Sequence, residues 1–111
     1  MGYRLEITEI AANDIDNVLG YIKDILSNPK AASSLLTKIE EKTNVIIANP
    51  YLFSDCSRYF IEDSNIRRAR AGEYFLIYRV SESDKTVQIL RFVHQRRNTY
   101  LMIMKQNEGN S

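Results

Sequence analysis

The chain has 111 residues, of which 44% are hydrophobic, and its 15 Lys and Arg nearly balance its 14 Asp and Glu. This composition excludes an intrinsically disordered chain, and the length predicts one domain over residues 1–111. The one cysteine, Cys56, excludes an internal disulfide framework and a cysteine-based zinc site, and no apolar run is long enough to span a membrane. We therefore expect a cytoplasmic protein, and the absence of a nucleotide-binding loop or metal-ligand pattern predicts that it has no cofactor and binds no metal.

The spacing of apolar residues predicts one strand and two helices in the first 50 residues. Residues 3–8 alternate between apolar and polar side chains, as in a half-buried strand. From Glu9 the apolar side chains recur on a helical stripe, and Thr8 is suited to cap this helix. Asn28-Pro29 separates it from a second helix that ends at Asn49-Pro50, because proline fits the first turn of a helix and disrupts its interior. So short a break predicts an antiparallel helix hairpin.

Each predicted helix has one apolar face that must be covered. In the first helix this face consists of Ile15, Val18, Leu19, Ile22, Ile25 and Leu26. In the second helix it consists of Ala32, Leu35, Leu36, Ile39, Thr43, Ile46 and Ile47.

The second half of the chain is predicted to be mainly strands. Residues 51–65 have no clear period and are expected to form a loop. Strand-like segments follow at 66–71, 74–80 and 86–93, and a polar hairpin loop separates the last two. A short C-terminal helix or tail is expected after residue 98. The order β-α-α-β-β-β predicts an α+β fold, in which the helix hairpin packs on one face of a mainly antiparallel sheet and leaves the other face open.

Basic side chains are concentrated in this second half. Residues 1–65 carry 6 basic and 10 acidic side chains, whereas residues 66–111 carry 9 basic and 4 acidic. Seven of the nine arginines lie within the predicted strands or just after them: Arg67, Arg68, Arg70, Arg79, Arg91, Arg96 and Arg97. Arginine binds carboxylate and phosphate through two parallel hydrogen bonds, so we expect the open face to bind an anionic partner. For Arg79 and Arg91 it is an equally good interpretation that the side chain extends to the sheet edge or forms an ion pair with Glu73 or Glu82.

Two segments resemble the RelE/ParE superfamily of bacterial toxins. They are the run from Gly72 to Val80, which contains Tyr-x-x-Tyr-Arg-Val, and the run from Val87 to Asn98, which contains Leu-Arg-x-x-His-x-Arg-Arg. The N-terminal strand and the helix hairpin ending in Asn-Pro match as well. The resemblance implies the toxin of a type II toxin–antitoxin module of the plasmid-stabilisation type. It also implies a partner, a cognate antitoxin that is acidic and partly disordered and forms a heteromeric complex with the toxin.

The superfamily contains two activities. RelE-like members cut messenger RNA on the ribosome without a metal, and the resemblance assigns the phosphate clamp and the acid/base of such a nuclease to Arg68, His94 and Arg96. Phe75, however, stands where these nucleases usually carry an arginine for the scissile phosphate. A single histidine at a strand end is also more often a structural hydrogen-bonding residue than a catalytic one.

ParE-like members poison DNA gyrase without nuclease chemistry and commonly have an apolar residue at the position of Phe75. The ending from His94 to Asn98 also resembles their His-x-Arg-Arg-Asp ending, with Asn98 in place of the usual aspartate. We therefore favour a ParE-like growth inhibitor acting on gyrase over a RelE-like endoribonuclease acting on the ribosome and mRNA. On this interpretation the residues that bind the target or the antitoxin are Arg67, Arg70, Arg79, Arg91 and Arg97.

Overall fold

The computed structural model describes residues 2–55 and 65–96. The predictions for residues 97–111, including the C-terminal helix or tail and the position of Arg97, lie outside the described residues, as does most of the predicted loop at 51–65. The described elements confirm the order β-α-α-β-β-β and add two short ones, η1 and β2. They are β1 (Arg4–Ile7), α1 (Glu9–Gly20), η1 (Tyr21–Ile25), α2 (Pro29–Ala48), β2 (Ser54–Asp55), β3 (Ile66–Ala71), β4 (Tyr74–Ser81) and β5 (Thr86–His94).

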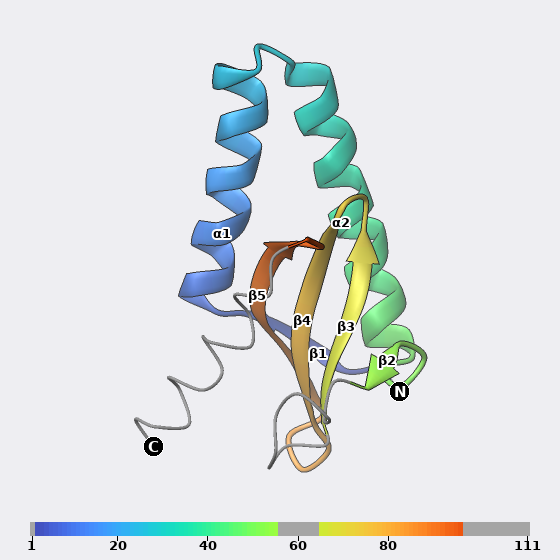
Figure 1. The fold of residues 1–111 in the computed structure, drawn as a ribbon. Helices are drawn as coiled ribbons and strands as arrows, with labels where there is room; N and C mark the ends of the chain where they lie inside the picture. Colours follow the sequence, from blue (N-terminus) through green and yellow to red (C-terminus); the bar gives the residue numbers. More distant parts are fainter. Residues whose placement is uncertain (1, 56–64, 97–111) are drawn as a thin grey trace.

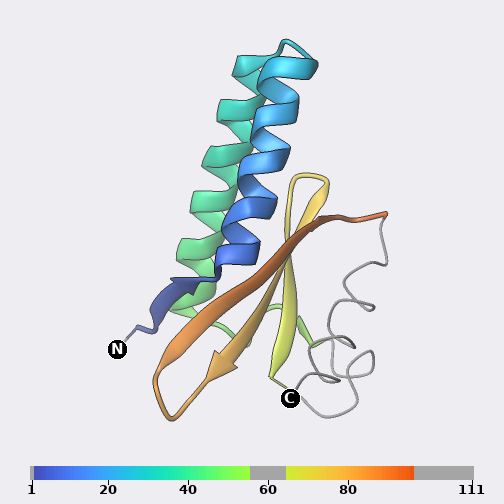
Figure 2. The ribbon, with the colours of Figure 1, turned by 90° about the vertical axis from the view of Figure 1, so that its left-hand side faces the viewer.

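The strands form one mixed sheet with the order β1-β5-β4-β3-β2. β1 pairs in parallel with β5, and the other neighbours are antiparallel. Both helices lie on one side of this sheet, and their connected ends project beyond it (Figure 1, Figure 2). The predicted two-layer α+β architecture is therefore confirmed.

Local side-chain caps define where the two helices begin. Thr8 accepts a hydrogen bond from the backbone N–H of Ala11 at 3.1 Å, which satisfies one of the free donors at the start of α1. Asn28 does the same for Ala31 at 3.1 Å, and Pro29 occupies the first turn of α2. The predicted helix starts are confirmed, and both have this physical cause.

The core-facing stripes are narrower than the sequence predicts. η1 is a π-helical turn that widens the end of α1, and the projecting end of the hairpin leaves Ile25 69% and Leu26 55% exposed. The prediction that these two residues are buried is wrong, because the hairpin extends past the sheet that would cover them (Figure 1). The prediction that Leu36 is buried is also wrong. Leu36 is 42% exposed, because it lies one position off the line of Ala32, Leu35 and Ile39.

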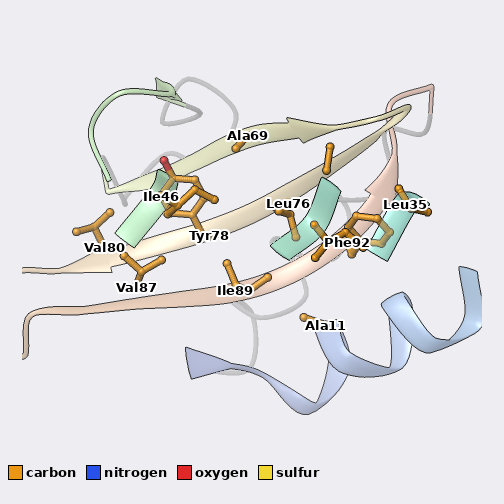
Figure 3. Packing of buried hydrophobic residues seen from close by; sticks show 12 residues of the cluster. Ala11, Leu35, Ile46, Ala69, Leu76, Tyr78, Val80, Val87, Ile89 and Phe92 are labelled. Atoms are coloured by element: carbon orange, nitrogen blue, oxygen red, sulfur yellow. The ribbon is translucent and has the colours of Figure 1, made fainter. Parts of the chain in front are cut away.

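The core lies between the helices and the inner face of the sheet. Leu76 and Tyr78 of β4 and Val87 and Ile89 of β5 have no solvent exposure, and they face Leu35, Ile46 and Ala11 from the helices (Figure 3). The buried Tyr78 hydroxyl donates to the carbonyl of Pro50 at 2.6 Å, so the end of α2 is held against the central strand.

Candidate functional site

Strand register decides which arginines leave the sheet on the face away from the helices. Ala69 pairs with Leu76, and both belong to the core on the helix side. Because side chains alternate along a strand, the neighbouring pairs point to the opposite face. Those pairs place three cations there, from β3 and β4: Arg68, Arg70 and Arg79. We call these three residues the outer arginines.

The sequence predicts that the face away from the helices is open. The structure shows that this outer face is open only in part. Ile66 is 1% exposed, Ile77 is fully buried and Val93 is 7% exposed, although all three lie on this face by register. The guanidinium of Arg68 lies 4.6 Å from the centre of the Phe75 ring, which is a cation–π contact. Exposed charge on the outer face is therefore found at Arg70, whereas Arg68 and Arg79 are half-buried.

Arg67 points to the helix side instead. It pairs with the core residue Tyr78, and its Nη1 donates to the carbonyl of Phe53 at 2.8 Å. Its guanidinium also lies 5.0 Å from the ring centre of Tyr51. The structure thus separates Arg67 from the outer arginines and uses it to hold the chain segment that follows α2.

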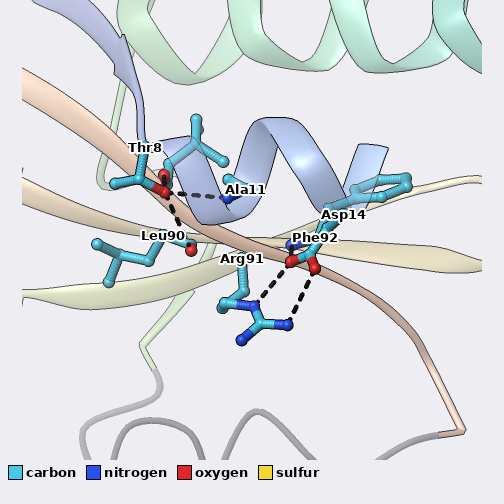
Figure 4. A network of polar contacts seen from close by, with 7 residues as sticks. Thr8, Ala11, Asp14, Leu90, Arg91 and Phe92 are labelled. Carbon is cyan, nitrogen blue, oxygen red and sulfur yellow. Dashed lines mark hydrogen bonds and ion pairs between the residues drawn. The ribbon is translucent and has the colours of Figure 1, made fainter. Parts of the chain in front are cut away.

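Arg91 lies on the outer face by register but is bound by a carboxylate from α1 (Figure 4). Its Nε and Nη2 donate to the two carboxylate oxygens of Asp14 at 2.7 and 2.9 Å, and the side chains of the pair are only 19% and 17% exposed. The interpretation that Arg91 forms an ion pair with Glu73 or Glu82 is therefore wrong, because its partner is Asp14. Asp14 reaches it because β1 pairs with β5 only as far as Ile89, which leaves the edge of β5 to α1.

A groove of about 570 Å³ lies beside this ion pair, and we call it the α1–β5 groove. Four of its nine lining residues carry aromatic rings. The rings of Tyr74 and Phe92 stack at 4.9 Å, and those of Tyr74 and His94 meet edge to face at 5.2 Å. The lining residues are Asp14, Asn17, Val18, Tyr21, Tyr74, Arg91, Phe92, Val93 and His94.

His94 and Arg96 lie together, but Arg68 does not join them. The backbone N–H of Arg96 donates to His94 Nδ1 at 3.1 Å, which leaves Nε2 as the ring nitrogen that faces other groups. That nitrogen lies 3.8 Å from the carboxylate of Glu73. His94 pairs with Tyr74, and Arg68 pairs with Ile77 three positions along β4, so the two side chains leave the sheet from opposite faces.

A second polar cluster lies at the β4–β5 turn. The Glu82 carboxylate accepts hydrogen bonds from the hydroxyls of Tyr3, at 2.6 Å, and Tyr51, and Lys85 bonds its other oxygen at 2.7 Å. The bonds from Lys85, Tyr3 and Tyr51 lower the pKa of Glu82 to about 2. Partial burial and the bond to Glu82 raise the pKa of Tyr51 to about 12. The cluster joins the residue before β1, the β4–β5 turn and the segment after α2.

Asp14 and Tyr74 were not predicted from the sequence to belong to this region. Asp14 lies on the polar side of the helical stripe beside Asp16, and no local pattern distinguishes the two. Its role arises from the contact between α1 and β5, which joins residues 77 positions apart.

Within residues 2–55 and 65–96, no group of three or more His, Cys, Asp or Glu side chains is arranged to bind a metal ion. No helix of that same part of the chain has the length and apolar character needed to cross a membrane.

Comparison with known proteins identifies the family. The family model of the ParE toxin of the type II toxin–antitoxin system parDE matches residues 5–99. No curated protein matches the chain.

Three solved structures have a similar fold. The chromosomal ParDE system from P. aeruginosa contains a chain with 21% identity and a TM-score of 0.65, over 83% of this chain and 95% of that one. The RelBE2 toxin–antitoxin complex from Mycobacterium tuberculosis gives 23% identity and a TM-score of 0.59, over 85% and 99%. The archaeal RelE–RelB complex from Pyrococcus horikoshii OT3 gives 23% identity and a TM-score of 0.58, over 87% and 99%.

Proposed function

Because this chain belongs to the ParE toxin family of type II toxin–antitoxin systems, we propose that it inhibits growth by binding DNA gyrase and is neutralised by a cognate antitoxin. The antitoxin part of the proposal is supported by the similar solved structures, which are toxin–antitoxin systems or complexes. The choice of gyrase rests on the geometry of the site.

One observation carries that choice. A metal-free ribonuclease needs its acid/base and its phosphate-binding cation on the same phosphate. Here Arg68 of β3 and His94 of β5 pair with β4 residues on opposite faces of the sheet, so only Arg96 of the two predicted phosphate-binding arginines lies beside His94. Phe75 has no cationic group to supply in place of the missing arginine. His94 Nδ1 is also already engaged by the backbone of Arg96. These contacts favour a structural role for His94 and a protein that acts by binding.

We assign the target contacts to the outer arginines, Arg68, Arg70 and Arg79. All three lie on one face of two adjacent strands, with Arg70 exposed and Arg68 and Arg79 half-buried, so they would present charge to one partner surface. Arg67 and Arg91 act in this proposal by holding the loop after α2 and the edge of β5.

The test is a gyrase supercoiling assay with the purified full-length chain. We expect supercoiling to stop and to recover when the cognate antitoxin is added. The variant Arg70→Gln should inhibit gyrase more weakly. A matched control is Arg4→Gln, which also removes an exposed arginine but lies on β1. Full supercoiling in the presence of the toxin, together with cut messages in a ribosome assay, would support the RelE-like activity instead.

A further inference from the structure

The α1–β5 groove opens where the helix hairpin and the sheet separate. Helix α1 contacts β5 at Arg91 and Phe92, and beyond this contact the end of β5 runs away from the helix (Figure 2). The groove of about 570 Å³ lies beside the contact. A cavity of this size is within the range of ligand-binding pockets, so it can hold a large side chain of a partner together with part of its backbone.

The α1 wall of the groove consists of Asn17, Val18 and Tyr21. Residues three and four apart lie on one side of a helix, so all three face the same space. Tyr21 is 54% exposed and does not belong to the core cluster. Among the residues that the structure describes, none forms a hydrogen bond with the side-chain amide of Asn17. This wall therefore offers a ring and an amide to a partner.

The sheet wall contains the stacked rings of Tyr74 and Phe92, whose centres are 4.9 Å apart. Aromatic rings attract one another face to edge or in offset stacks, because the ring face is negative and the edge is positive. A third ring placed between Tyr21 and this stack gains such contacts, which an aliphatic side chain of similar size does not. The groove is therefore suited to an aromatic side chain.

Strand register connects the groove to the outer arginines. Arg70 pairs with Phe75, and Phe75 pairs with Val93, which lines the groove. Neighbouring strands lie about 4.8 Å apart, so two steps across the sheet, or about 10 Å, separate Arg70 from the strand of Val93. A protein interface of ordinary size covers about 800 Å² on each partner, which is wide enough to span this distance. A target that contacts Arg70 therefore also reaches the groove.

We propose that the α1–β5 groove receives one aromatic side chain of gyrase, while the outer arginines bind acidic side chains of the same gyrase surface. The inference rests on the proposed function and adds the chemistry of the target segment. Binding energy in protein interfaces is concentrated in a few buried anchors, often aromatic, that are surrounded by polar contacts. A segment of the antitoxin and a second copy of this chain are the competing occupants.

The first experiment compares Asn17→Trp with Asn13→Trp in the supercoiling assay with the full-length chain. The ring added at position 17 would fill the groove, so we expect half-inhibition to require about ten times more toxin. Asn13 is also exposed on α1 but does not line the groove, so the same replacement there should leave inhibition near the wild-type level. Thermal unfolding of both variants shows whether any loss of inhibition comes from loss of the fold.

Photo-crosslinking identifies the occupant directly. The probe is p-benzoylphenylalanine in place of Tyr21, and it should crosslink to a gyrase segment that contains Phe, Tyr or Trp. The same probe in place of Asn13 should not crosslink to gyrase. A crosslinked gyrase segment without an aromatic residue would overturn the inference.

The remaining outcomes separate this inference from the proposed function. Equal inhibition by Asn17→Trp and Asn13→Trp would overturn the inference and leave the proposed function intact. Weaker antitoxin binding by Asn17→Trp with full inhibition of gyrase would assign the groove to the antitoxin, and crosslinked dimers of the toxin would assign it to a second copy. Either result would also overturn the inference. Failure of the wild-type chain to inhibit gyrase would instead overturn the proposed function.

Discussion

Asp14 and Arg91 join the first helix to the last described strand across 77 residues of sequence. The Asp14 carboxylate accepts two hydrogen bonds from the guanidinium and a third, at 3.0 Å, from the backbone N–H of Phe92. Thr8, which precedes α1, donates its hydroxyl to the carbonyl of Ile89 at 2.9 Å. Thr8 and Asp14 thus form hydrogen bonds with backbone groups on the edge of β5 beyond the end of β1. Helix α1 also supports one wall of the α1–β5 groove.

Asp14→Asn should lower the free energy of unfolding by about 2 kcal/mol, because it leaves the largely buried guanidinium of Arg91 without its counter-charge. Chemical denaturation checks this. Asp16→Asn is the control, because it removes an exposed carboxylate from the same helix and should change stability by less than about 0.5 kcal/mol. Equal losses in the two variants would contradict the role assigned to the pair.

The two glycines at positions 20 and 72 should respond to alanine in opposite directions. Gly72 has a φ of 63° in the β3–β4 turn, so Gly72→Ala should destabilise the protein by about 1 kcal/mol. Gly20 is helical, and an added Cβ would meet no atom within 4 Å, so Gly20→Ala should stabilise it by about 0.5–1 kcal/mol. Thermal unfolding of both variants measures the difference, and destabilisation of Gly20→Ala would contradict it.

Acid should weaken the Glu82 cluster in a defined pH range. The pKa of Glu82 in the folded state is about 2, below its ordinary value of 4.5, so the folded state favours the carboxylate. This contribution to stability is complete above about pH 4.5 and is lost as the pH falls towards 2. Glu82→Gln should therefore make urea unfolding less dependent on pH in this range than in the wild-type chain. The exposed Glu40→Gln is the control and should retain the wild-type slope.

His94→Asn should retain gyrase inhibition and toxicity in cells. The proposed function gives His94 no chemical step, and the asparagine oxygen can still accept the bond from the backbone of Arg96. Inhibition of supercoiling and survival of bacteria after induction are the measurements. Loss of toxicity together with loss of mRNA cleavage, in a variant of unchanged stability, would favour the RelE-like nuclease.

The sequence was sufficient to predict the layers of this fold. The alternation in residues 3–8, the helical stripes and the breaks at Asn28-Pro29 and Asn49-Pro50 are local signals, and each depends only on nearby residues. They predicted the confirmed β-α-α-β-β-β order. The family was also recognisable, because its Tyr-x-x-Tyr-Arg-Val and Leu-Arg-x-x-His-x-Arg-Arg segments are contiguous.

Only the tertiary structure decided how the arginines are used. A shift of one residue in strand pairing moves every side chain to the other face, so the sequence could not tell that Arg67 points to the helices while Arg68 points away. Nor could it find Asp14 as the partner of Arg91, because that contact exists only once α1 lies on the edge of β5. Local periodicity determines which elements form, whereas register and long-range contact determine which charges remain available to a partner.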